Sequence, residues 1–159
     1  MVRILYGAME NQAGSTVADA QRLLRVASPE FAKIDLTPVS ASTSNYVYVT
    51  SDSSIVRFPH NDWVRDGFQR EHKLLSLLNG HLGVSIPRID LFNETPVFMA
   101  YKAIEGMVAS RDVVSTLNSE RRARFGATLG AFMARLHGEP TEKFDFLPQR
   151  YGEELLRQL

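Results

Sequence analysis

The chain has 159 residues, enough for one ordinary domain or for one domain and part of another. Apolar residues make up 44% of the chain and charged residues 23%, and 18 basic side chains balance 18 acidic ones, so no overall charge would attract nucleic acid or an acidic membrane. The absence of cysteine excludes a disulfide scaffold, thiolate metal sites and a cysteine nucleophile.

No apolar run approaches the length that a transmembrane helix needs. The first seven residues make a poor signal peptide, because their apolar run is short and Glu10 soon follows it. We therefore expect a cytoplasmic protein without a membrane partner.

The first forty residues predict one helix and one short strand. Residues 1–16 have no clear period and are interpreted as a loose extension. Ser15 or Thr16 is suited to cap a helix that runs to about Val26. Residues 31–36 then look like an edge strand that ends at Pro38.

The stretch from Asn45 to Leu78 predicts strand, turn, strand, loop and helix. Residues 45–50 and 55–58 are rich in β-branched and aromatic side chains, and the short polar residues 51–54 between them favour a turn. We expect the helix over about residues 66–79. Trp63 would lie in the loop before it, covering the amino end of the helix or contacting a partner.

Two charges in this stretch stand where charges are costly. Strand alternation places Arg57 opposite Val56 and Phe58, and Glu71 interrupts an apolar stripe formed by Phe68, Leu75 and Leu78. An unpaired carboxylate on such a stripe is unfavourable, so Glu71 either pairs with Arg57 or reaches solvent at a boundary.

The rest of the chain predicts two further strands and then helices. Residues 88–92 and 97–101 read as an antiparallel pair, residues 102–110 as a linker and residues 112–117 as a short helix. Ser119 is expected to cap a long helix whose inner face carries Phe125, Leu129, Phe132 and Leu136. Residues 151–159 begin another amphipathic helix with nothing after it, which predicts that the sequence stops inside a domain.

Six short motifs stand out along the chain: Asn45–Val49, Ile55–Pro59, Arg70–Leu75, Ile86–Arg88, Tyr101–Gly106 and Leu129–His137. They occur in the order found in aminoglycoside phosphotransferases, and over roughly residues 17 to 145 the chain resembles that family, which has the protein-kinase-like fold. The resemblance implies an α+β amino-terminal lobe of about five antiparallel strands and one packed helix, followed by the first helices of a helical lobe.

The resemblance also implies domain boundaries. Residues 1–16 would be an extension, residues 17–101 a nucleotide-binding lobe, residues 102–110 a hinge, and residues 111–159 the start of a truncated helical lobe.

The site residues follow from the same resemblance. The loop from Ser42 to Asn45, which includes Ser44, would cover the phosphates of ATP or GTP, although it lacks the glycines of a Gly-rich loop. Arg57 stands where the family usually has a phosphate-binding lysine, and Glu71 would orient that cation. Tyr101, Lys102 and Ile104 would form the hinge that pairs with the purine.

The groups that perform phosphoryl transfer are missing from the sequence. The family supplies a catalytic Asp and the ligands for Mg from a His-Gly-Asp…Asn loop and an Ile-Asp-like segment, and neither occurs here. Asp145 stands between two phenylalanines, but Leu147 replaces the glycine of the metal-binding Asp-Phe-Gly motif, so a packing turn is the better interpretation. The chain alone is therefore not expected to catalyse, and it offers no catalytic or metal-binding residue.

Two hypotheses remain open. The chain is the amino-terminal portion of a phosphotransferase that acts on an aminoglycoside or another small hydroxyl acceptor, with a role in antibiotic resistance, or it is a non-catalytic nucleotide-binding or interaction module. No pair of histidines has metal-site spacing and no Gly-x-Ser-x-Gly occurs. Arg121 and Arg122 lie beside Glu120 and predict a solvated helix face rather than a nucleic-acid site.

Overall fold

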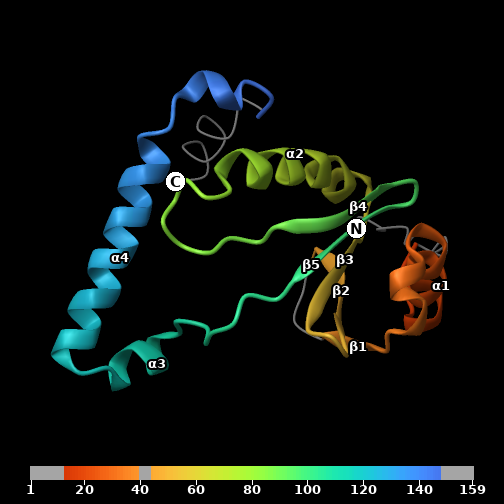
Figure 1. Ribbon diagram of the computed structural model, residues 1–159, viewed down its shortest axis with the longest axis horizontal. Helices are drawn as coiled ribbons and strands as arrows, with labels where there is room; N and C mark the ends of the chain where they lie inside the picture. The colour runs from red at the N-terminus through yellow and green to blue at the C-terminus, as the bar shows by residue number, and fades with distance from the viewer. Residues whose placement is uncertain (1–12, 40–43, 148–159) are drawn as a thin grey trace, which may run out of the picture. The chain divides into compact units, whose positions relative to one another are not determined.

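The computed structural model describes residues 13–39 and 44–147 (Figure 1). The expected carboxyl-terminal helix, most of the expected extension and loop residues 40–43 lie outside the described residues. In chain order the elements are α1 (Val17–Ala27), a 3-10 helix (Pro29–Lys33), β1 (Leu36–Val39), β2 (Asn45–Thr50), β3 (Ser54–Pro59), α2 (Asp62–Leu78), β4 (Ile89–Glu94), β5 (Val97–Lys102), α3 (Arg111–Thr116), α4 (Ser119–His137) and a second 3-10 helix (Thr141–Phe144).

Five antiparallel strands form one sheet in the order β1-β2-β3-β5-β4, which confirms the predicted α+β lobe. The register places Arg57 of β3 beside Val47 of β2 and Met99 of β5. Successive residues of a strand point to opposite faces of the sheet, so Arg57 and Met99 share one face and Val56 and Phe58 share the other.

Each face of the sheet carries its own apolar core and its own helix. On one face, α1 packs through Ala20, Leu23 and Leu24 against a cluster that includes Val56, Phe58, Phe98 and Ala100. On the other face, Phe68 of α2 packs with Val97 and Met99. Helices α1 and α2 therefore cover opposite sides of the sheet (Figure 1).

The chain just before α1 is part of this core, so the interpretation of residues 13–16 as a loose extension is wrong. The buried Tyr48 hydroxyl donates a hydrogen bond to the Gly14 carbonyl at 2.7 Å. Gly14 has φ +75°, and a Cβ atom at this position would lie 2.2 Å from the Phe58 ring. Only glycine permits this close approach in this conformation. Thr16 caps α1, as predicted, by accepting a hydrogen bond from the Asp19 amide.

The first strand lies further along the chain than predicted. Pro29 begins a 3-10 helix that contains Phe31, and the strand covers Leu36 to Val39. Pro38 does not end this strand, because β1 lies at the edge of the described sheet, where its one neighbour is β2, and an edge strand tolerates a missing donor on its outer side.

Two helix starts also differ from the prediction. Helix α2 begins at Asp62, where the Asn61 side chain accepts a hydrogen bond from the Val64 amide, so Trp63 lies in the first turn with 71% of its surface exposed. Helix α4 is capped by Asn118, whose side chain accepts from the Arg121 amide, and not by Ser119. In both places an asparagine oxygen reaches a free helical amide ahead of the expected start.

The chain divides into two compact units, residues 1–72 with 88–103, and residues 73–87 with 104–159. One boundary between the units falls within α2 and another falls between Ala103 and Ile104, inside the range predicted as a hinge, whose role stays a prediction. In the second unit Glu139 pairs with His81 at 3.4 Å and with Lys143 at 2.8 Å. Gly83 packs against the Arg135 guanidinium, since a Cβ there would lie 1.4 Å from its Nη1.

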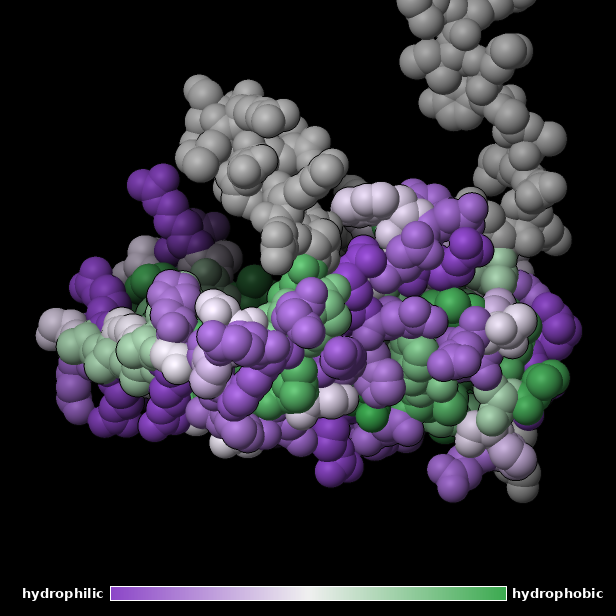
Figure 2. Space-filling model, turned by 90° about the horizontal axis from the view of Figure 1, so that it is seen from above, coloured by the Kyte–Doolittle hydropathy of each residue, from purple (hydrophilic) through white to green (hydrophobic). Residues whose placement is uncertain are grey.

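Helix α4 has the predicted apolar period but contains no buried residue. Phe125, Leu129 and Met133 remain 40%, 49% and 39% exposed. On the molecular face seen in Figure 2, hydrophilic side chains predominate and apolar ones show between them. None of the helices among the described residues is long and apolar enough to cross a membrane.

Candidate functional site

Arg57 extends from the centre of the sheet onto the α2 face. Its guanidinium carbon lies 5.1 Å from the centre of the Phe68 ring, and its Nη1 lies 3.9 Å from the Met99 sulfur. The apolar neighbours remove most of the water from this cation, and only 18% of its side chain is exposed. Such a cation requires an anionic partner.

Glu71 is that partner, and it binds Arg57 through both carboxylate oxygens. The Arg57 Nη1 donates to Glu71 Oε1 at 2.5 Å and the Nη2 donates to Oε2 at 3.2 Å. A two-point contact between a planar guanidinium and a carboxylate fixes orientation as well as distance. Glu71 is 35% exposed, but pairing and not solvation explains its place among Phe68, Leu75 and Leu78.

The pKa of Arg57 is subject to two opposing influences. Burial, the largest single influence, lowers the pKa of Arg57, because a low-dielectric environment disfavours the charged form. Hydrogen bonding and the charge of Glu71, with a smaller contribution from Tyr101, outweigh burial and raise the pKa of Arg57 above its usual value. The cation is therefore present at every pH at which the protein would be studied.

Ser44 and Asn45 lie at the end of the sheet where β2 begins. The exposed Ser44 accepts a hydrogen bond from the His60 amide through its carbonyl at 3.1 Å, and Asn45 is paired with Pro59. Tyr46, the next residue, packs against His60 with ring centres 4.1 Å apart and ring planes tilted by 58°. These contacts hold the end of the predicted phosphate loop in place. Residues 42 and 43 of that loop lie outside the described residues.

The predicted hinge begins at the end of β5. Tyr101 packs at the edge of the core that contains Phe68. The Lys102 amide donates to the Asp90 carboxylate at 3.2 Å, and its ammonium binds Asp52, so neither of these Lys102 groups faces a purine. Ile104 belongs to the second unit, where it is 48% exposed.

Asp52 and Asp90 did not emerge from the sequence as site residues. Asp52 lies in a polar turn and Asp90 in an edge strand, and neither position has a periodic pattern that indicates a contact with residue 102. Their proximity to Lys102 depends on the order of strands β3, β5 and β4, which no short motif encodes.

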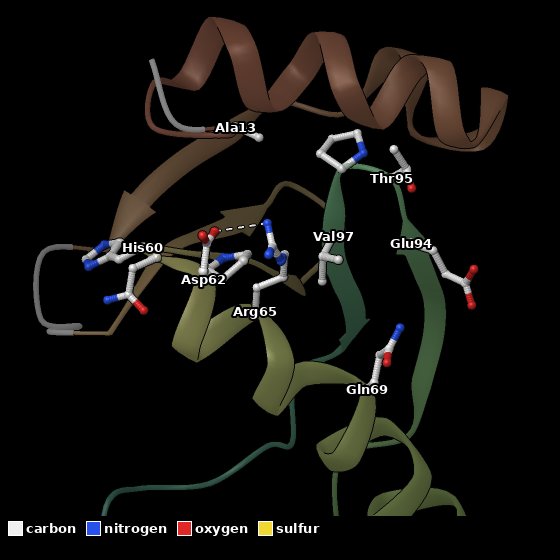
Figure 3. A pocket seen from close by; sticks show the side chains of 11 residues that line it. Ala13, His60, Asp62, Arg65, Gln69, Glu94, Thr95 and Val97 are labelled. Atoms are coloured by element: carbon white, nitrogen blue, oxygen red, sulfur yellow. Dashed lines mark ion pairs between the residues drawn. The ribbon is translucent and has the colours of Figure 1, made fainter. Parts of the chain in front are cut away.

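A pocket of about 510 Å³ lies elsewhere in the first unit, between the start of α2 and the β4–β5 turn (Figure 3). His60, Asp62, Arg65 and Gln69 line one side, and residues 94–97 line the other. Asp62 and Arg65 form an ion pair at 2.9 Å. None of the predicted nucleotide residues lines this pocket, so it is a separate feature.

Within residues 13–39 and 44–147, no group of three or more His, Asp or Glu side chains is arranged to hold a metal ion. The described residues therefore do not fit the magnesium that phosphoryl transfer requires. Asp145 follows a 3-10 helix and is exposed, and the neighbouring Phe146 ring lies 4.1 Å from the Lys73 ammonium. This contact agrees with the interpretation of the segment as a packing turn.

Solved structures of antibiotic kinases share this fold. The GDP complex of a point mutant of aminoglycoside 2′-phosphotransferase-IIIa superposes with a TM-score of 0.78 at 20% identity, over 90% of this chain and 50% of that one. The streptomycin–ATP complex of APH(2″)-IIa gives 0.72 at 19% identity, over 89% and 48%. The macrolide 2′-phosphotransferase MphH from Brachybacterium faecium gives 0.62 at 20% identity, over 87% and 51%.

The chain thus spans about half the length of these solved proteins. No curated protein matches it. Residues 35–159, however, match the phosphotransferase enzyme family, and this range contains the whole sheet, the Arg57–Glu71 pair and α4. By this match over most of its length, the chain belongs to the phosphotransferase enzyme family.

Proposed function

We propose that this chain is the nucleotide-binding portion of a phosphotransferase that moves the terminal phosphoryl group of ATP or GTP to a hydroxyl of an aminoglycoside or a related small molecule. The observation that supports this most directly is the bidentate pair between Arg57 and Glu71. In a kinase-like lobe such a pair holds a cation for the α- and β-phosphates.

Arg57 suits this role despite being an arginine. A guanidinium has five N–H donors, and Glu71 takes two of them, so donors remain for phosphate oxygens. Glu71 orients the fork, and the Phe68 and Met99 side chains restrict its rotation. The cation is thereby preorganised for an anion, which reduces the entropy lost on binding.

The purine would pair with backbone groups of residues 101–104. The Lys102 amide already binds Asp90 and the Ala103 amide already binds the Ser53 carbonyl, so neither is the donor in this proposal. Ser44 and Asn45 would approach the phosphates from the end of β2. Their short polar side chains and backbone amides would replace the contacts that glycines provide in a Gly-rich loop.

The acceptor is proposed from the solved proteins of the same fold, whose complexes contain kanamycin, streptomycin or gentamicin. The described residues contain no group of three or more His, Asp or Glu side chains arranged to hold a metal ion, and the sequence lacks the His-Gly-Asp…Asn loop that the resemblance leads one to expect. Transfer is therefore proposed for a polypeptide that reaches the full length of those proteins, and nucleotide binding for the chain itself.

Calorimetry with ATP and GTP tests the nucleotide site. We expect Glu71→Gln to weaken binding by about 10-fold or more, because the neutral amide no longer fixes the Arg57 fork. The matched control is Asp66→Asn, which makes the same change from carboxylate to amide at an exposed position of the same helix. Its affinity should equal that of the unmodified chain.

Two results would contradict the proposal. The first is absence of nucleotide binding by the unmodified, folded chain. The second is a Glu71→Gln variant that binds nucleotide normally but has a much lower Tm, which would make the pair purely structural. If the extended polypeptide binds nucleotide but transfers no phosphate to any hydroxyl acceptor, the alternative of a non-catalytic module holds instead.

A further inference from the structure

We infer that Asp52 is a positioning residue for the purine end of the nucleotide site, because it fixes the end of β5 through Lys102. This inference rests on the proposed nucleotide site. It concerns the contacts that hold the last two residues of the first unit, Lys102 and Ala103, from which the predicted hinge continues.

The Lys102 side chain reaches back to the turn between β2 and β3. Its ammonium donates to the Asp52 carboxylate and, at 2.9 Å, to the Asp52 backbone carbonyl. The two residues are 50 positions apart in the sequence, so the contact joins separate parts of the sheet. Two acceptors from one residue fix the ammonium more closely than a single carboxylate would.

The Asp52 carboxylate is itself held in place. The buried Thr50 hydroxyl donates to one carboxylate oxygen at 2.5 Å, and the buried Ser54 hydroxyl donates to the other at 3.3 Å. The hydrogen bonds from Lys102 and then from Thr50 lower the pKa of Asp52 to about 2. The carboxylate is therefore fully charged at neutral pH.

The backbone of the same turn makes a second contact. Ser53 has φ +62°, a left-handed conformation that is uncommon for serine. Its carbonyl accepts a hydrogen bond from the Ala103 amide at 2.9 Å. The residue whose carbonyl holds the start of the hinge is thus one with an uncommon backbone conformation.

A third contact comes from the other side of β5. The Asp90 carboxylate on β4 accepts a hydrogen bond from the Lys102 amide at 3.2 Å. Lys102 and Ala103 are consequently held from β4 on one side and from the β2–β3 turn on the other, although both residues are exposed.

Stability alone does not explain this arrangement. The side chains of Lys102 and Asp52 are 60% and 42% exposed, and ion pairs this open contribute little to the free energy of unfolding. The pair instead fixes the position of the backbone at Lys102 and Ala103. A purine recognised by backbone groups needs that position to be accurate, because hydrogen bonds weaken steeply when distance or angle is lost.

Probes that separate base from phosphate test the inference. The affinities of ATP, adenosine and inorganic tripolyphosphate are measured for the unmodified chain and for Asp52→Asn and Lys102→Met. We expect both variants to bind ATP and adenosine about 5- to 10-fold more weakly and to bind tripolyphosphate unchanged, with Tm altered by only a few degrees. The exchanged pair, Asp52→Lys with Lys102→Asp, should recover part of the lost affinity for adenosine.

Each other outcome overturns the inference in a recognisable way. If the variants lose affinity for tripolyphosphate and ATP equally, or for neither, Asp52 does not position the purine, whereas the proposed nucleotide site still stands. If the unmodified chain binds neither ATP nor tripolyphosphate, the proposed function fails and this inference fails with it. A large fall in Tm with unchanged affinity of the folded protein assigns the pair to stability alone.

Discussion

The first unit and the second unit cover their apolar side chains to different extents. Of the fourteen apolar residues that are buried in the described part of the chain, twelve belong to the first unit, and the second contributes Leu78 and Leu82. Helices α2 and α4 both have a periodic apolar stripe. The stripe of α2 packs through Phe68 on the sheet, whereas α4 has no buried residue.

This difference shows that a sequence pattern can predict a helix without predicting what the helix packs against. A period of 3.6 predicts a helix and identifies the face that would pack. It does not indicate whether the packing partner is present in the same segment. The chain spans about half the length of the solved proteins with this fold, which have further residues that this segment does not match.

The largest expected effect on stability comes from truncating a buried phenylalanine of the first unit, with an exposed phenylalanine of the second unit as the comparison. Phe58 is fully buried in the α1 core, and Phe58→Ala should lower the free energy of unfolding by about 3–5 kcal/mol. Phe125 is 40% exposed on α4, and Phe125→Ala should cost less than about 1 kcal/mol. Urea unfolding followed by circular dichroism measures both. Equal losses would show that α4 is covered in solution.

A pair of glycines should give effects of opposite sign. Gly14→Ala forces a side chain into a left-handed backbone and against the Phe58 ring, so we expect a loss of about 2–4 kcal/mol. Gly126 lies within α4 with open space where a Cβ would be, and Gly126→Ala should stabilise that helix by about 0.5–1 kcal/mol. A destabilised Gly126→Ala would reveal a neighbour for α4. An unaffected Gly14→Ala would mean that the docking of residues 13–16 is weak.

Replacing the site cation by the residue usual in the family should have a smaller effect. Arg57→Lys keeps the charge but cannot make the two-point contact with Glu71, so we expect a loss of about 1 kcal/mol in stability. Nucleotide binding should remain within about 10-fold, because lysine also binds phosphate as a point charge. Loss of all binding would show that the site depends on the guanidinium fork.

The smallest expected effect is the pH dependence of the stability that Asp52 contributes. The pKa of Asp52 in the folded chain is about 2, below its ordinary value of 3.8. Its contribution to stability is therefore complete above about pH 4 and is lost as the pH falls toward 2. Because the side chain is 42% exposed, that contribution should be below about 1 kcal/mol. The Tm difference between the unmodified chain and Asp52→Asn should shrink over this range, and a constant difference would argue against the ion pair.

The sequence predicted the parts of the fold that depend on local patterns. Strand alternation at Arg57 and the helical stripe around Glu71 predicted two alternatives, a pair with Arg57 or a carboxylate that reaches solvent, because an isolated charge in either place is costly, and the structure confirms the pair. Four of the five strands and α4 were predicted in the same way, whereas the strand predicted over residues 31–36 overlaps β1 only at Leu36.

The features that were missed depend on contacts between distant segments or on competing local chemistry. The contact of Lys102 with Asp52 and Asp90 requires the strand order, which a linear pattern does not reveal. Helix α2 begins earlier than its apolar stripe indicates, because the Asn61 side chain accepts a hydrogen bond from the Val64 amide. Gly14 gave no signal at all, since its role is to leave room for Phe58.

Helix α2 is one continuous helix, but the boundary between the two units falls directly after His72. Its first part is attached to the sheet by Phe68 and Glu71, and the part from Lys73 onward belongs to the less buried unit. Amide hydrogen exchange should therefore be graded along a single helix, slow near Phe68 and faster toward Leu77. Glu71 lies about two helical turns before the carboxyl end of α2, so fraying from that end reaches it after those two turns have unfolded. Local unfolding of the second unit would therefore weaken the contact between Glu71 and Arg57 while the sheet remained folded.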